Sequence, residues 1–232
     1  MLPALVLASW WAQAEPAPVE PAPAPPVAVP APPPPLRVFN DRLAITIGYG
    51  ARLGDEAARV GPRNGFAVSA GHEHRFVPLP RHFDFGAGVE FDYHKFATTV
   101  TGTVMPTPGQ TQSYSGDRLL SYASFLATAG LSWRWSPIRP YLQLGAGVSI
   151  AYFNTPEMSL SPGSLTAAQP MGRMAGGMDI AITAEIAVTI RLAYTHPFTH
   201  PTLTTDASSG APATYSFLGD LFDAGAGVAL GF

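Results

Sequence analysis

The chain has 232 residues, of which 47% are hydrophobic and only 12% are charged. An ordinary soluble domain carries about 25% charged residues, so this composition indicates that much of the surface does not face water. The net charge is -3 and Lys95 is the only lysine, which excludes the clustered basic surface of a nucleic-acid-binding protein. The chain has no cysteine, which excludes disulfides and thiolate metal sites.

The N-terminal part of the chain has two segments of unusual composition. Residues 1–14 contain an apolar run followed by Ala-Gln-Ala, a pattern that favours signal-peptidase cleavage before Glu15. A basic region before the apolar run is missing, which leaves open whether Met1 is the true start. Residues 15–41 are rich in Pro and Ala, a composition typical of an extended linker without a core. We therefore expect a signal peptide over 1–14 and a periplasmic linker over 15–41.

Residues 42–232 show hydrophobic alternation with a period of two, which is typical of β-strands. Within 42–53, for example, Leu43, Ile45 and Ile47 share one face, whereas small and polar residues share the other. No stretch supplies the roughly 18 to 20 uninterrupted apolar residues of a membrane helix. The alternation predicts eight strands, within residues 42–53, 66–77, 83–94, 119–135, 142–152, 174–182, 188–194 and 222–232.

The connections between these strands alternate in length. Short ones fall around residues 78–81, 136–140 and 184–187, and long ones around 54–64, 98–118, 154–172 and 197–214. Short turns at one end and long loops at the other are typical of transmembrane barrels. The pattern therefore predicts one all-β domain over 42–232, an eight-stranded antiparallel up-and-down barrel with long extracellular loops.

Alternation alone does not distinguish a transmembrane barrel from a soluble one of the lipocalin kind. A soluble barrel needs a charged exterior, but the less apolar face is mostly Gly, Ala, Ser and Thr, and the chain has only 13 basic residues. We therefore expect the bulky face to contact lipid and the small-residue face to line a narrow interior. Aromatic residues near the strand ends are predicted to form two girdles, from Tyr49, Tyr93, Trp133, Trp135, Tyr141, Tyr152 and Tyr194.

The last strand ends in Phe232 behind Leu230 and Val228, and it resembles the C-terminal signature of bacterial outer-membrane barrels. Residues 42–232 resemble the small eight-stranded superfamily that includes the OmpA membrane domain, OmpX and OmpW. The resemblance rests on architecture and the last strand, so it does not assign a subfamily. It implies these three residues as the assembly signal and the β-barrel assembly machinery as the insertion partner. We also expect contact with outer-membrane lipid and lipopolysaccharide, a cell-wall contact through the linker, a monomer, and no cofactor.

Charged residues on the small-residue face are expected inside the barrel. Turns centred near Leu79 and Glu185 would place Arg75 opposite Asp84 and Asp179 opposite Arg191 as ion pairs. The predicted interior network consists of Arg52, Glu73, Arg75, Asp84, Glu90, Asp92, Arg134, Asp179, Arg191 and Asp223. Buried charges are costly unless paired, so we expect a polar plug, with a gated path for ions or small solutes as the alternative.

Histidines offer only weak signals for a metal or catalytic site. His72 and His74 share one strand face, and His196 lies four residues before His200 in a predicted loop. Asp92 and His94 share the interior face, but no serine that the sequence can locate completes a triad.

The leading hypothesis is accordingly a non-enzymatic envelope anchor without a metal. The alternatives are a narrow passive channel for small or hydrophobic solutes, as in the OmpW group, and surface recognition through the loops.

Overall fold

The computed structural model describes residues 41–54, 62–79, 82–107, 109–154, 165–199, 202–205, 213–216 and 219–231. All of these residues belong to one compact unit of the chain. The predicted signal peptide, the predicted linker except Asp41, and Phe232 lie outside the described residues.

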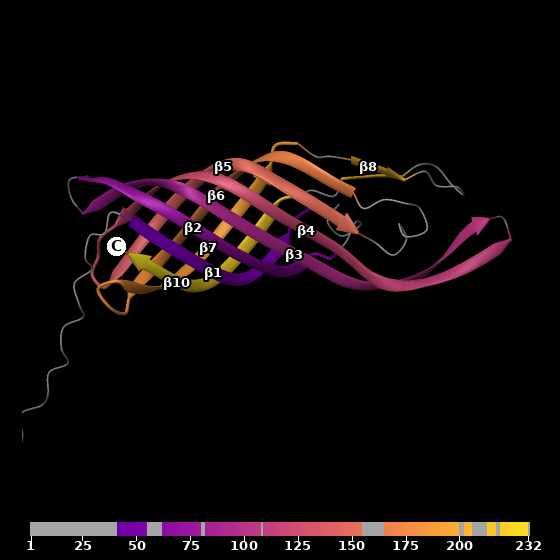
Figure 1. Cartoon of the computed structure of the whole chain (residues 1–232), viewed down its shortest axis with the longest axis horizontal. Helices are drawn as coiled ribbons and strands as arrows, with labels where there is room; N and C mark the ends of the chain where they lie inside the picture. Colours follow the sequence, from indigo (N-terminus) through magenta and orange to yellow (C-terminus); the bar gives the residue numbers. More distant parts are fainter. Residues whose placement is uncertain are drawn as a thin grey trace, which may run out of the picture. The chain divides into compact units, whose positions relative to one another are not determined.

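Antiparallel strands close into a single ring of eight, in the order β1-β10-β7-β6-β5-β4-β3-β2. Figure 1 shows the barrel from the side. This confirms the predicted all-β, eight-stranded barrel. A separate two-stranded sheet pairs β8 with β9. The strands are β1 (Asp41–Arg52), β2 (Asn64–Leu79), β3 (Phe83–Thr107), β4 (Gln110–Trp133), β5 (Ile138–Asn154), β6 (Leu165–Ala181), β7 (Ile186–Pro197), β8 (Thr202–Thr205), β9 (Ala213–Ser216) and β10 (Leu221–Gly231).

No helix in the described part of the chain is long and apolar enough to cross a membrane.

The two faces of the strands differ as the alternation predicts. On β7, Val188, Ile190 and Leu192 are exposed, whereas Thr189 and Arg191 between them are buried. Successive side chains of a strand point to opposite faces, so the bulky residues cover the outside and the small or polar ones fill the interior. Such an exterior suits lipid better than water, and an eight-stranded interior is only wide enough for side chains.

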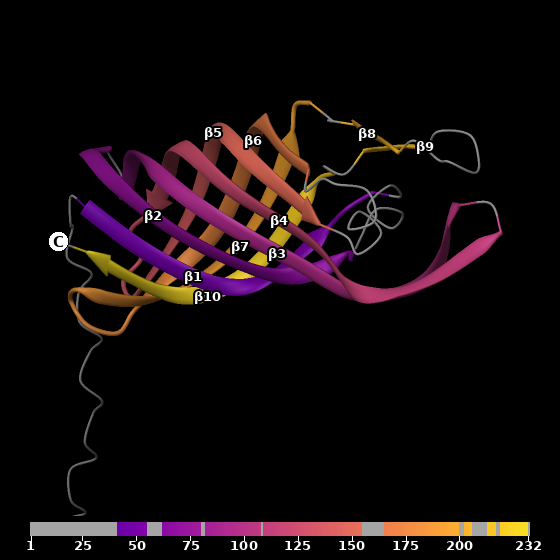
Figure 2. The same cartoon turned by 45° about the vertical axis from the view of Figure 1, so that its right-hand side comes forward.

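One end of the barrel carries a β-ribbon where the sequence predicts an irregular loop. β3 and β4 stay paired from Thr98 opposite Arg118 out to Thr107 opposite Gln110, and the ribbon projects beyond the other strands in Figure 2. Alternating Thr and Val in this segment favour a strand. Gly109 in the turn has φ of 87°, a left-handed conformation that glycine adopts without strain.

Two further predicted loops contain strands. β6 begins at Leu165, whereas the alternation predicts a start at Met174. β8 lies within the predicted loop 197–214, and β9 begins within it. The first residues of β6 are mostly small or polar, so their period is weak, but pairing with β5 from Phe153 onward keeps them in the sheet. We call the end with the β3–β4 ribbon the loop end. We call the opposite end, with the connection between β2 and β3 and the turns near residues 134–137 and 182–185, the short-turn end.

Candidate functional site: the barrel interior

At the short-turn end, an arginine from β1 reaches across the interior to β6. Arg42 donates from Nε and one terminal nitrogen to the two carboxylate oxygens of Asp179, at 2.8 and 2.7 Å. The same terminal nitrogen lies 3.3 Å from the hydroxyl of Thr189. The Arg42 guanidinium also stacks over the ring of Tyr141, 4.8 Å from its centroid. A two-point pair of this kind fixes the geometry of both side chains.

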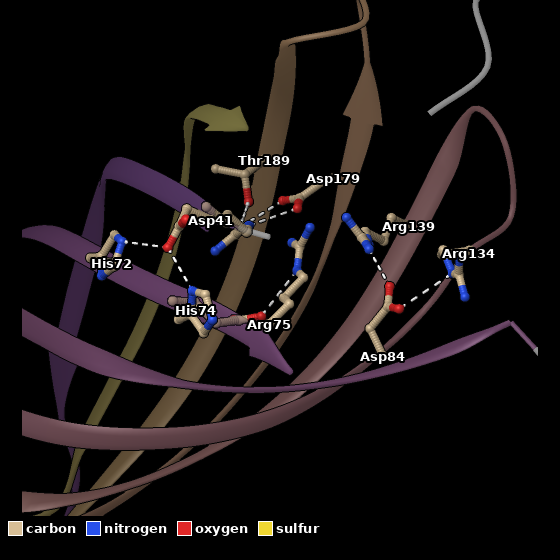
Figure 3. Close-up of polar contacts among 11 residues, drawn as sticks. Asp41, His72, His74, Arg75, Asp84, Arg134, Arg139, Asp179 and Thr189 are labelled. Carbon is tan, nitrogen blue, oxygen red and sulfur yellow. Dashed lines mark hydrogen bonds and ion pairs between the residues drawn. The ribbon is translucent and has the colours of Figure 1, made fainter. Parts of the chain in front are cut away.

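A second set of ion pairs lies beside the first. Asp84 of β3 contacts Arg139 of β5, and its other oxygen is 3.3 Å from Nε of Arg134 (Figure 3). Arg75 and Glu73, both on β2, are joined by a bond of 3.2 Å from the arginine Nε. Strands β3 and β5 are two steps apart in the ring, so the pair of Asp84 and Arg139 crosses over β4.

The middle of the barrel is bridged from wall to wall. Arg191 of β7 donates to the hydroxyl of Ser69 on β2 at 2.7 Å and pairs with Glu90 on β3. Arg173 of β6 lies 3.3 Å from the same glutamate and also pairs with Asp92. Each of these four charged side chains is at most 6% exposed.

Toward the loop end, the charged network meets an apolar cluster. Arg173 donates to Asp223 of β10 at 2.9 Å, and His94 of β3 lies 3.4 Å from the same carboxylate. The His94 ring stacks on Phe96, which meets Tyr122 edge to face at 5.9 Å. We call the buried group at this level the apolar cap, and it consists of Phe96, Leu120, Tyr122, Ala151, Phe153 and Leu221. Each of its members is at most 4% exposed.

The space left between these side chains is small. Three cavities bounded by interior residues measure about 20, 10 and 30 Å³. A single water needs roughly 10 to 15 Å³ on this measure, so each cavity holds one to about three waters. The polar network and the apolar cap therefore leave only water-sized spaces at these three places.

The structure places the predicted network residues inside the barrel but pairs them differently. Arg75 lies opposite Gly86 and not Asp84, and Arg191 lies opposite Gly177 and not Asp179. Both predicted pairings are wrong because the turns sit one residue further along in the first hairpin and one residue earlier in the second. Each error displaces the register by two residues, which leaves the inward or outward direction of every side chain unchanged.

Three arginines of the interior are absent from the network that the sequence predicts. Arg42 is the first residue of its predicted strand, Arg139 falls in a predicted turn, and Arg173 lies one residue before the predicted start of its strand. The period of two places Arg42 inside, and extending the other two strands by three residues and one residue at the same period would place Arg139 and Arg173 inside as well. With them, seven arginines meet six carboxylates in the described interior, where the sequence predicts four against six.

One predicted girdle residue is misplaced. Tyr141 points inward, where its hydroxyl lies 3.4 Å from that of Thr189. It has the opposite parity to Leu142 and Leu144, which are exposed on the outside of β5, so the alternation itself signals the inward direction. The remaining members lie on the outward face or beyond its end, namely Tyr49, Tyr93, Trp133, Trp135, Tyr152 and Tyr194.

The histidines have carboxylate partners. His72 and His74 both contact one oxygen of Asp41, at 3.2 and 2.9 Å. His94 contacts Asp223, so the expected neighbourhood of Asp92 and His94 does not form an acid-base pair. Within the described ranges no group of three or more His, Asp or Glu side chains is arranged to hold a metal ion.

His200 lies outside the described residues, so the spacing of His196 and His200 gains no structural account. His196 instead lies 2.7 Å from Asp220, whose other oxygen accepts a bond from Tyr194.

The fold matches known outer-membrane barrels. Neisserial surface protein A superposes with a TM-score of 0.53 at 13% identity, over 83% of this chain and 97% of that one. A major outer-membrane protein of Thermus thermophilus gives 0.46 at 11% identity, over 83% and 99%, and the outer-membrane protease OmpT of Escherichia coli gives 0.42 at 10%, over 83% and 97%. No protein-family model and no curated protein matches the sequence. A likeness at such low identity shows the fold, and a fold does not specify an activity.

Proposed function

We propose that this chain, which has the fold of the small bacterial outer-membrane β-barrels, is a non-enzymatic envelope anchor with a closed lumen. The observation that carries the proposal is the bridge of Arg191 to Glu90 across the middle of the barrel, with the apolar cap behind it. A solute would have to break buried ion pairs and then pass an aromatic layer. Either barrier by itself is costly, because an unpaired buried charge and a hydrated apolar cluster are both unfavourable.

A non-enzymatic role is supported by the state of the interior acid-base groups. His94 is 2% exposed and stacked against the apolar cap, and its carboxylate partner Asp223 is also bound to Arg173. A catalytic pair needs access to a substrate atom at hydrogen-bond distance. The cavity that reaches His94 measures about 10 Å³, which admits one water and no substrate.

The proposed orientation places the short-turn end in the periplasm and the loop end outside the cell, as in transmembrane barrels generally. The segment over 15–41 would then be a periplasmic linker that reaches the cell wall. The aromatic residues of the outward face would mark the two interfaces, in contact with lipid and lipopolysaccharide. Val228, Leu230 and Phe232 would serve the assembly machinery, and the barrel would act as a monomer without a cofactor.

Display of the β3–β4 ribbon is a second role that the structure favours. Residues 98–118 pair only with one another, because β2 follows β3 no further than Phe96 and β5 joins β4 from Leu119. The ribbon thus adds nothing to barrel closure, and its exposed face is rich in Thr, Ser and Gln. We propose it as the part of the protein that meets external partners.

Conductance of the refolded protein in a planar bilayer tests the closed lumen. We expect no stable single-channel steps from the wild type, once heat-modifiable migration on a gel has verified folding. Replacing the bridge and the cap together, as in Glu90→Ala, Arg191→Ala and Phe96→Ala, should produce openings. Stable steps in the wild type would contradict the plug and favour a narrow passive channel for small or hydrophobic solutes.

A further inference from the structure

The mouth of the barrel at the short-turn end contains more guanidinium groups than buried carboxylates. Four arginines meet three such carboxylates there, namely Arg42, Arg75, Arg134 and Arg139 against Glu73, Asp84 and Asp179. Asp179 is occupied on both oxygens by Arg42, and Asp84 is shared by two arginines. Arg75 has Glu73 as its carboxylate partner, so the excess positive charge is shared over the group of four arginines.

Arg75 has an unused face. Its Nε is held by Glu73 at 3.2 Å, and among the described residues none bonds to its two terminal nitrogens. The side chain is only 5% exposed, so this charge cannot rely on full hydration. A buried cation in this state is costly unless an anion or ordered water completes its bonds.

A cavity of about 30 Å³ lies against this face. Arg42, Arg75 and Arg139 line it together with Asp179, and the turn from Thr183 to Ile186 forms its rim. Figure 3 shows the guanidinium of Arg75 between Asp179 and Arg139. The volume corresponds to about two waters, which is room for the two oxygen atoms that a carboxylate or phosphate would present to Arg75.

We propose that this cavity is a binding site for an oxyanion, a carboxylate or a phosphate group, that enters from the short-turn end. The two terminal nitrogens of Arg75 form a planar fork that matches two oxygens of such a group, and Arg42 and Arg139 add positive charge beside it. Glu185 stands exposed on the rim and forms no ion pair with a described basic residue. Its negative charge weakens the positive electrostatic potential of the cavity but does not neutralise Arg75.

The biological source of the anion depends on the proposed orientation. If the short-turn end faces the periplasm, a carboxylate of an acidic wall peptide and a phosphate-bearing molecule are the two sources. The binding chemistry does not depend on the orientation or on the closed lumen. Failure of the site and failure of the proposed anchor function are therefore separate results.

Titration calorimetry of the full chain in detergent micelles tests the site, with sodium phosphate and sodium acetate in separate runs at constant ionic strength set by chloride. We expect saturable binding of at least one anion. Phosphate alone would indicate a phosphate-bearing source, and acetate alone a carboxylate. Arg75→Gln should weaken binding at least tenfold, whereas Arg63→Gln, the same change in an exposed residue at the loop end, should leave it unaltered.

A second variant covers the case in which Arg75→Gln does not fold. Glu185→Gln alters only the exposed rim, so folding should persist, and removing its negative charge should strengthen binding about twofold. Absence of saturable binding to either anion in folded wild type, or equal binding in folded Arg75→Gln, would overturn the proposal. The cavity would then be a site for water.

Discussion

Arg191 on β7 and Glu90 on β3 form an ion pair between strands that lie on opposite sides of the barrel. Three strands separate them in either direction around the ring, β6, β5 and β4 on one side and β10, β1 and β2 on the other. The two residues are 101 positions apart in the sequence. Because the pair spans the interior, it links the two halves of the wall across the barrel.

Removing Arg191 should therefore destabilise the barrel. Arg191→Met leaves Glu90 with Arg173 at 3.3 Å as its remaining partner, and we expect a loss of about 3 kcal/mol in the free energy of unfolding. Urea unfolding in phospholipid vesicles measures this loss. The double variant Glu90→Gln and Arg191→Met should lose less than the sum of the single variants, and additive losses would show that the pair contributes nothing by itself.

The apolar cap should behave as a packed core. Phe96 is fully buried against Tyr122 and His94, so Phe96→Ala should lower the free energy of unfolding by about 3 to 4 kcal/mol through the cavity it creates. Phe198→Ala removes the same atoms from a side chain that is 61% exposed, and it should cost less than half as much. Equal losses in the same unfolding experiment would contradict the cap.

Close contact between β1 and β10 makes one glycine essential. A Cβ atom at Gly227 would overlap the carbonyl oxygen of Ile45, which belongs to the backbone of the neighbouring strand and cannot move aside. Gly227→Ala should therefore reduce the yield of heat-modifiable, folded protein severalfold. Gly176→Ala is the matched control, because the nearest atom to its Cβ would be at 3.7 Å, an ordinary contact. Equal yields of the two variants would argue against a tight closure here.

The ribbon should be dispensable for folding. Replacing residues 99–117 by a short turn removes no strand pairing of the closed ring, since among the described strands this segment of β3 and β4 pairs only with itself. The shortened protein should keep its heat-modifiable migration on a gel and lose any binding to external partners. Failure to fold would mean that the ribbon supports the barrel in a way that strand pairing does not show.

The sequence by itself determined the direction of most side chains. The period of two in a strand makes Ile190 point outward once Arg191 points inward, whatever the pairing with other strands. For the same reason the predicted network residues reached the interior although both predicted hairpin registers were wrong by two residues. Tyr141 could have been placed correctly by the same rule. The eight-stranded fold followed from the number of alternating runs.

The sequence was less informative where the alternation is weak. Arg173 lies just before the predicted strand, where the residues are mostly small or polar, yet it makes three ion pairs in the interior. The segment 98–118 is predicted as a connection, yet most of it pairs as a ribbon of β3 and β4. In each case pairing with a neighbouring strand, and not local periodicity, decides the secondary structure.

Only the tertiary structure decided which charges meet. Closure of the ring brings β3 opposite β7 and β1 within reach of β6, so that Arg191 finds Glu90 and Arg42 finds Asp179. These partners lie on strands that share no hydrogen bonds, and their meeting depends on how the strands are staggered around the barrel. The alternation contains no signal for that stagger, because the same inward-facing residues are compatible with several different staggers of the strands. The sequence thus determined a barrel with a charged interior, and the closure of the barrel determined which of these charges pair across it.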